Sequence, residues 1–129
     1  MPFVRIDLPQ GKPAEYQKAI GEIVYQAMRE IIDVPENDKF QVITEHAPGG
    51  LNLADGYMGN RYSNDVILIQ MTISFGRSVE KKQTLYKRIA DHLHERLQVR
   101  RDDVVINIVE VAKENWSFGH GIAQYAQGN

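Results

Sequence analysis

The sequence contains no cysteine among its 129 residues, which excludes disulfide bonds, thiolate metal sites and thiol catalysis. It has no apolar run near the roughly 18 residues of a membrane span, and no charged and then apolar leader segment. A formal net charge of -2 and an isoelectric point near 6.1 give no electrostatic footprint for nucleic acid or an anionic membrane. We therefore expect a cytoplasmic enzyme or binding protein with neither polyanionic partners nor a metal site.

The length predicts one domain, 1–129, and within it the chain repeats itself. An offset of 65 residues lays segment 2–46 on segment 67–111 without a gap and carries Gly11 onto Gly76. The apolar pattern agrees at the same offset, so each segment is interpreted as one structural unit. The matched apolar pairs include Val4 with Ile69, Ile6 with Met71, Leu8 with Ile73, and Ile20 with Leu85.

Each unit is predicted to be a strand, a helix and a second strand, because β-rich runs flank a stretch with apolar residues at helical spacing. Pro13 suits the first turn of the first helix, and Ser78 suits the N-cap of the second. The fold class is α+β (α/β), a four-stranded sheet that is parallel within each β-α-β unit and carries both helices on one face. The predicted elements are strand 3–8, helix 13–33, strand 40–46, strand 66–73, helix 78–97 and strand 104–111.

Two features of the sequence suggest that the chain assembles with other copies of itself. The run Val66–Ile69 is unbroken and apolar, which predicts cover on both faces of its strand, whereas two helices cover only one. We infer that other copies of the chain cover the second face. The segment 47–64 is too long for an unstructured connection, so we expect it to carry a short hairpin or to pack on a neighbouring subunit.

Pro2 stands directly ahead of the first strand. If Met1 is removed, Pro2 carries a free secondary amine, which can take and give a proton near neutral pH. If Met1 is kept, the nitrogen is an ordinary amide and Pro2 has no chemistry. The sequence alone leaves both alternatives open.

With these features the sequence resembles the tautomerase superfamily, and within it the malonate semialdehyde decarboxylase-like members. The resemblance covers most of the chain. It rests on Pro2, on Gly11-Lys12 and Gly76-Arg77 after the first strand of each unit, on Val42-Ile43-Thr44-Glu45, on segments 33–38 and 66–70, and on Trp116-Ser117-Phe118-Gly119.

The resemblance implies a cofactor-independent enzyme that acts on a small oxo-carboxylate by keto-enol tautomerisation or by decarboxylation. It implies a homotrimer, with a hexamer as the alternative. By the resemblance, Pro2 is the catalytic proline, Arg77 binds the substrate carboxylate and Asp38 positions the proline or a water. Substrate-binding residues would be Phe75, Trp116, Phe118 and Lys12, the last being the repeat counterpart of Arg77.

One position departs from the decarboxylase pattern. Phe75 occupies a place where that group has a second arginine, which argues against carbon dioxide release and favours either a tautomerase or an oxo-acid substrate with an apolar part. Two other classes remain open, a cytokine-like binding protein of the same fold and an oligomeric structural module that keeps Met1. Asp38 also has a repeat counterpart, Asp103, so a purely structural role is as good an interpretation for it as catalysis.

Overall fold

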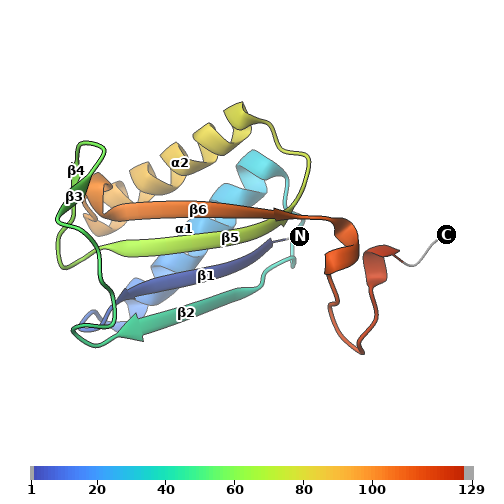
Figure 1. Cartoon of the computed structure of the whole chain (residues 1–129), viewed down its shortest axis with the longest axis horizontal. Coiled ribbons are helices and arrows are strands. Elements are labelled where there is room, and N and C mark those ends of the chain that lie inside the picture. The colour runs from blue at the N-terminus through green and yellow to red at the C-terminus, as the bar shows by residue number, and fades with distance from the viewer. Residues whose placement is uncertain (1, 127–129) are drawn as a thin grey trace.

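The structure, a computed structural model, describes residues 2–126. Two helices lie side by side on one face of a four-stranded mixed sheet, which confirms the predicted fold class (Figure 1). No helix in the described part of the chain is long and apolar enough to cross a membrane. The sheet consists of β1 (Pro2–Pro9), β2 (Gln41–His46), β5 (Ile67–Ser74) and β6 (Val104–Val111), and the helices are α1 (Ala14–Ile32) and α2 (Val79–Leu97).

The strand order is β2-β1-β5-β6. The outer pairs β1–β2 and β5–β6 are parallel, as each β-α-β unit predicts, and the central pair β1–β5 is antiparallel. The two parallel pairs share one register, since Val4 lies opposite Gln41 and Ile69 opposite Ile106, 37 positions on in each case. Because the central strands β1 and β5 are antiparallel, equivalent positions of the two units lie at opposite ends of the sheet.

The core fills the space between the sheet and the helices. Alternate residues of β1 and β5 face it, and all are at most 2% exposed, from Val4 and Ile6 to Ile73. On the helices, Ile20 and Leu85 are fully buried against them. Burying side chains of this size stabilises a fold by about 1.5–3 kcal/mol each, so this layer fixes where the strand ends lie.

Helix ends follow local chemistry. The Ser78 hydroxyl caps α2 by accepting a hydrogen bond of 3.1 Å from the backbone N–H of Lys81, as predicted. Pro13 is the N-cap of α1 and not a residue of its first turn, so the helix begins one residue later than expected. Asp33 ends α1 in the left-handed conformation, with φ of 59°.

The sheet face away from the helices is mixed in character, which corrects the expectation that the run Val66–Ile69 makes both faces of its strand apolar. Val66 precedes β5 and is buried, while Ile67 and Ile69 face the helices, so the run gives the other face only Leu68. The same face holds a hydrogen bond of 3.0 Å from Gln70 to Asn107. Apolar surface there is confined to a few side chains, among them Phe3, Val42 and Val109.

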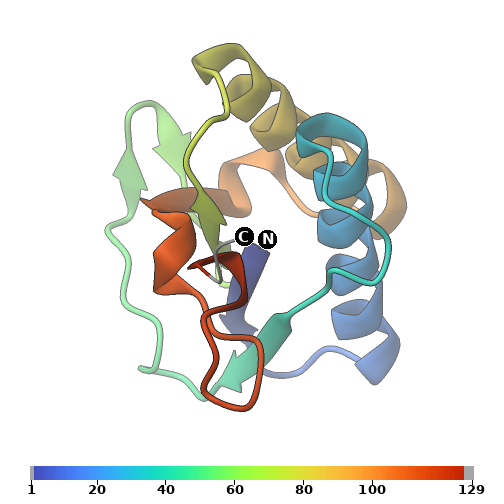
Figure 2. The ribbon, with the colours of Figure 1, turned by 90° about the vertical axis from the view of Figure 1, so that its right-hand side faces the viewer.

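Short elements complete the chain. The hairpin expected in segment 47–64 is present as β3 (Gly56–Tyr57) paired with β4 (Asn60–Arg61), at the left of Figure 1. After β6 the tail folds back across the end of the sheet where β1 begins (Figure 2). Three short 3₁₀ helices are η1 (Arg101–Asp103), η2 (Lys113–Asn115) and η3 (Gln124–Ala126).

Candidate active site

The site is built where β1 begins and β5 ends. Pro2 is buried and pairs with Ile73, the next-to-last residue of β5. The backbone N–H of Val4 donates a hydrogen bond of 2.9 Å to the carbonyl of Phe40, which places the loop before β2 alongside the start of β1. Segments that are far apart in the sequence thus meet around Pro2. Met1, whose removal would free the amine, lies outside the described residues.

Arg77 follows β5 and is held by the backbone. Its guanidinium donates hydrogen bonds of 3.1 Å to the carbonyl of Ser74 and to that of Ile32 at the end of α1. No carboxylate in residues 2–126 forms an ion pair with it. A guanidinium has five N–H donors, so the donors left over remain available for an anion. The positive charge at this helix start, where it opposes the local dipole, is thus fixed in place by two carbonyls.

Asp38 is 6% exposed, and both carboxyl oxygens are inaccessible to solvent. Burial raises the pKa of Asp38, because desolvation penalises the charged form, while positive groups nearby, Arg77 among them, act in the opposite direction. Asp38 is therefore a carboxyl group in electrostatic contact with the Arg77 guanidinium, while the role implied by the resemblance, positioning the proline or a water, stays a prediction. Its repeat counterpart Asp103 is also buried, at the other end of the sheet.

An aromatic cluster forms one side of the site. Trp116 and Phe118 stack with ring centres 5.5 Å apart and planes 13° apart. Phe118 also contacts Phe40 at 5.6 Å and meets Tyr125 edge to face at 5.6 Å. The indole N–H of Trp116 donates a hydrogen bond of 3.2 Å to the hydroxyl of Ser74, which ties the tail to the end of β5.

A hollow of about 310 Å³ opens beside these groups. Phe75, predicted as substrate-binding, lines it and is 64% exposed. Sequence reasoning missed Lys113, Tyr125 and Ser74 as lining residues, and no motif marks them. The full lining is Ser74, Phe75, Gly76, Arg77, Lys113 and Tyr125.

The structure does not bring Lys12 to this site within one chain. Lys12 follows β1, at the opposite end from Pro2, where its ammonium lies 3.5 Å from Asp65 and 5.5 Å from the ring centre of Tyr16. Although Lys12 is the repeat counterpart of Arg77, the antiparallel pairing of β1 and β5 puts counterparts at opposite ends. A role for Lys12 in binding substrate therefore stays a prediction that would require a second copy of the chain.

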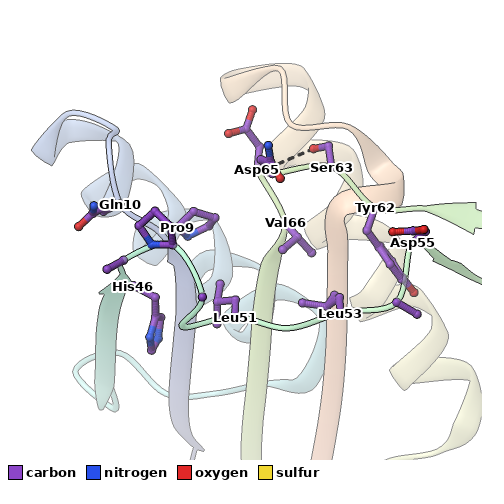
Figure 3. A pocket seen from close by; sticks show the side chains of 15 residues that line it. Pro9, Gln10, His46, Leu51, Leu53, Asp55, Tyr62, Ser63, Asp65 and Val66 are labelled. Carbon is purple, nitrogen blue, oxygen red and sulfur yellow. Dashed lines mark hydrogen bonds between the residues drawn. The ribbon is translucent and has the colours of Figure 1, made fainter.

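That opposite end holds a second hollow, of about 540 Å³, bounded by segment 47–64 and the ends of β1 and β2 (Figure 3). In Figure 3, Leu51 and Leu53 lie along it, with His46 at the β2 side. The repeat counterpart of Pro2 at this end is Ile67. The counterpart of Asp38, Asp103, is saturated by hydrogen bonds from the Ser63 backbone N–H and hydroxyl at 2.8 and 2.5 Å. Within residues 2–126, a buried proline and a buried aspartate thus combine at only one end of the sheet.

No group of three histidine, aspartate or glutamate side chains in the described range could hold a metal ion. What the Pro2 end assembles is a buried proline, a buried carboxyl group, an anchored guanidinium and an aromatic wall. Comparison with known proteins gives this arrangement a family. Two family models, both described as tautomerase enzyme, match residues 38–119 and residues 2–61.

The chain belongs to the tautomerase family. It is 36% identical to the probable tautomerase YusQ of Bacillus subtilis (strain 168), over 96% of this chain and 98% of the relative. Among solved structures, FG41 malonate semialdehyde decarboxylase inhibited by 3-bromopropiolate is 36% identical. It superposes with a TM-score of 0.88 over 95% of this chain and 93% of the other. A fused 4-OT described as a symmetric trimer shares the fold, with 20% identity and a TM-score of 0.79 over 98% and 99% of the two chains.

Proposed function

We propose that this tautomerase acts on a small oxo-carboxylate, with Pro2 as the general acid and base once Met1 is removed. The observation that supports this most is the convergence of Pro2, Asp38 and Arg77 at one end of the sheet, although they come from three separate segments. Keto-enol tautomerisation needs a group that moves a proton to or from carbon and a group that fixes the carboxylate. Pro2 and Arg77 supply these two functions.

The roles follow from the chemistry of each group. The N–H donors of Arg77 that do not bond to backbone carbonyls offer a planar pair of groups that can bind a carboxylate at both oxygens. This grip would orient an enol over the ring nitrogen of Pro2, which as an ammonium donates a proton to the substrate carbon. The hydroxyl proton of the enol then leaves to Asp38, directly or through water, and the keto acid is formed. Proton return from Asp38 to Pro2 restores the starting state.

Asp38 suits an exchangeable proton. Its raised pKa brings the neutral and charged forms closer in free energy than in a solvent-exposed aspartate, so the group can accept and release a proton within a turnover. The aromatic wall of Trp116 and Phe118 keeps water from the reacting carbon and strengthens the electrostatic interactions inside the site.

Decarboxylation of a 3-oxo acid is the second candidate, because the 36% identical neighbour is a malonate semialdehyde decarboxylase. In that reaction the bond from the α-carbon to the carboxylate carbon breaks, carbon dioxide leaves, and the electron pair forms the same type of enolate, which Pro2 then protonates on carbon. Phe75, apolar and exposed at the hollow, favours tautomerisation, since it leaves Arg77 as the one arginine among the lining residues.

We also propose that the protein is a homotrimer, with a hexamer as the alternative. The fused 4-OT with the same fold is described as a symmetric trimer. The helix-free face of the sheet, with Phe3, Val42 and Val109 each about two-fifths exposed, is the surface that such assembly would cover.

The test is the Pro2→Ala variant, assayed for ketonisation of phenylenolpyruvate and for carbon dioxide release from malonate semialdehyde. Intact mass first establishes that Met1 is absent from both proteins. We expect the variant to lose turnover of the active substrate at least about 100-fold, the lower end of what general acid–base catalysis contributes, while its oligomeric state is unchanged. Equal rates for the two proteins would exclude Pro2 as the catalyst and would leave a binding role for the fold.

A further inference from the structure

Two cations face the same hollow at the Pro2 end of the sheet. Arg77 and Lys113 both line it, together with Phe75 and Tyr125. At about 310 Å³ the hollow has the size of a site for a small ligand. The proposed function uses one of these cations and leaves Lys113 without a role.

The position of Lys113 is set by the backbone. It begins η2, two residues after β6 ends at Val111. The backbone N–H of Phe75 donates a hydrogen bond of 3.1 Å to the carbonyl of Val111, so the ends of β5 and β6 are tied together. Arg77 and Lys113 therefore reach the hollow from two neighbouring strand ends.

In the described part of the chain neither cation forms an ion pair, although the buried carboxyl group of Asp38 is close enough to interact electrostatically with Arg77. Glu110, three positions before Lys113, forms its ion pair with Lys82 at 2.9 Å. The ammonium of Lys113 lies 5.9 Å from the ring centre of Tyr125, and Arg77 donates to backbone carbonyls. A concave surface lined by two cations that form no ion pair attracts ligands with more than one negative charge.

We propose that Lys113 is a second anion-binding residue of this site, which therefore binds oxo acids with two carboxylates in preference to monocarboxylates. This proposal rests on the proposed function for the location of the substrate site, but it does not depend on which reaction takes place there. The guanidinium of Arg77 takes one carboxylate in a two-point grip, and the ammonium of Lys113 takes the other as a point charge. If Lys113 instead only supported the Tyr125 ring, ligand preference would not depend on it.

The experiment compares equilibrium binding of malonate and propionate, which have three carbons each and differ by one carboxylate. Isothermal titration at low ionic strength would be done on the wild type, Lys113→Gln, Lys113→Arg and Lys18→Gln. The control Lys18 is an exposed residue of α1 outside the hollow, so its variant has the same net charge as Lys113→Gln. Circular dichroism checks that all four proteins fold alike.

We expect Lys113→Gln to weaken malonate binding roughly five- to tenfold, as for one partly exposed charge-assisted contact, and to leave propionate binding within about twofold. Lys113→Arg should recover most of the affinity, and Lys18→Gln should behave as the wild type. Equal weakening for both ligands, an equal effect of Lys18→Gln, or no malonate preference in the wild type would overturn the inference. Because turnover is not measured, a chain that prefers malonate but fails the Pro2→Ala assay would retain the inference and lose only the proposed chemistry.

Discussion

Arg77 provides the sharpest test of how the site works, because its contacts allow the effects on substrate and on stability to be separated. Its guanidinium donates two hydrogen bonds of 3.1 Å to carbonyls, which leaves three N–H donors for a ligand. A hydrogen bond to a charged group contributes about 1.5–3 kcal/mol. A two-point grip on a carboxylate at a site open to water on one side should then contribute about 3–4 kcal/mol.

Since about 1.4 kcal/mol is a factor of ten, Arg77→Ala should lower kcat/KM for an oxo-carboxylate about 100- to 1,000-fold. Arg77→Lys keeps the charge but not the planar fork, so it should recover about tenfold of that loss. The carbonyls of Ser74 and Ile32 would gain water in exchange, so stability should fall by only about 1–2 kcal/mol, or about 5 °C in Tm. Ketonisation of phenylenolpyruvate gives kcat and KM, and calorimetry gives Tm.

The matched control is Arg96→Ala, which removes an exposed guanidinium 3.8 Å from Glu22 on the helices, away from the hollow. It should leave kcat/KM within about twofold, because exposed ion pairs contribute only about 0–1 kcal/mol. A fall of less than threefold for Arg77→Ala in a folded protein would refute the assignment of Arg77 as the carboxylate clamp. The clamp would then have to be sought among other cations, Lys113 first.

Two further predictions concern Asp38 and Ser74. Because the folded-state pKa of Asp38 is raised above its ordinary value of 3.8, its contribution to stability is full below that pH and is lost as pH rises through the raised pKa. Asp38→Asn should therefore gain stability relative to the wild type as pH rises above about 4, in thermal denaturation across pH 3–7, and an unchanged difference would contradict this. Ser74→Ala should cost about 1 kcal/mol by leaving the Trp116 indole N–H without its acceptor, but close to nothing in a Trp116→Phe background. Additive effects in denaturant unfolding would show that the two side chains act independently.

The sequence predicted the secondary structure well because local chemistry decides it. Apolar residues at helical spacing and the Ser78 hydroxyl place α2, and β-rich runs place the four long strands. The resemblance, and not the repeat, predicted Pro2, Asp38 and Arg77 as site residues, and the structure places all three at one end of the sheet. The prediction from the run Val66–Ile69 failed, because Val66 is buried ahead of the strand and residues alternate between the two faces of the sheet only from Ile67 onward.

Other parts of the site could not be predicted because they depend on how the tail returns to the sheet. Gly119 and Gly121 take φ of 143° and 67°, conformations that favour glycine, and this turn leads to Tyr125 against Phe118. Nothing in the spacing of these residues encodes the strand end on which the turn folds. The position of Lys113 at the hollow could not be predicted for the same reason, because this hollow exists only once β5 and β6 are paired in register.

The two ends of the sheet show why a repeated fold has a single site. Each end has a buried aspartate, but the Asp103 carboxylate is saturated by Ser63, whereas Asp38 faces the Arg77 charge. The position equivalent to Pro2 is Ile67, which lies within the chain, so no substitution there could create a free backbone amine. The free backbone amine that the proposed function requires can arise only where a chain begins, and the antiparallel pairing of β1 with β5 fixes the end of the sheet at which Pro2 lies. Under the proposed function, topology therefore confines the chemistry to the Pro2 end of the sheet, where Arg77, Asp38 and the tail converge.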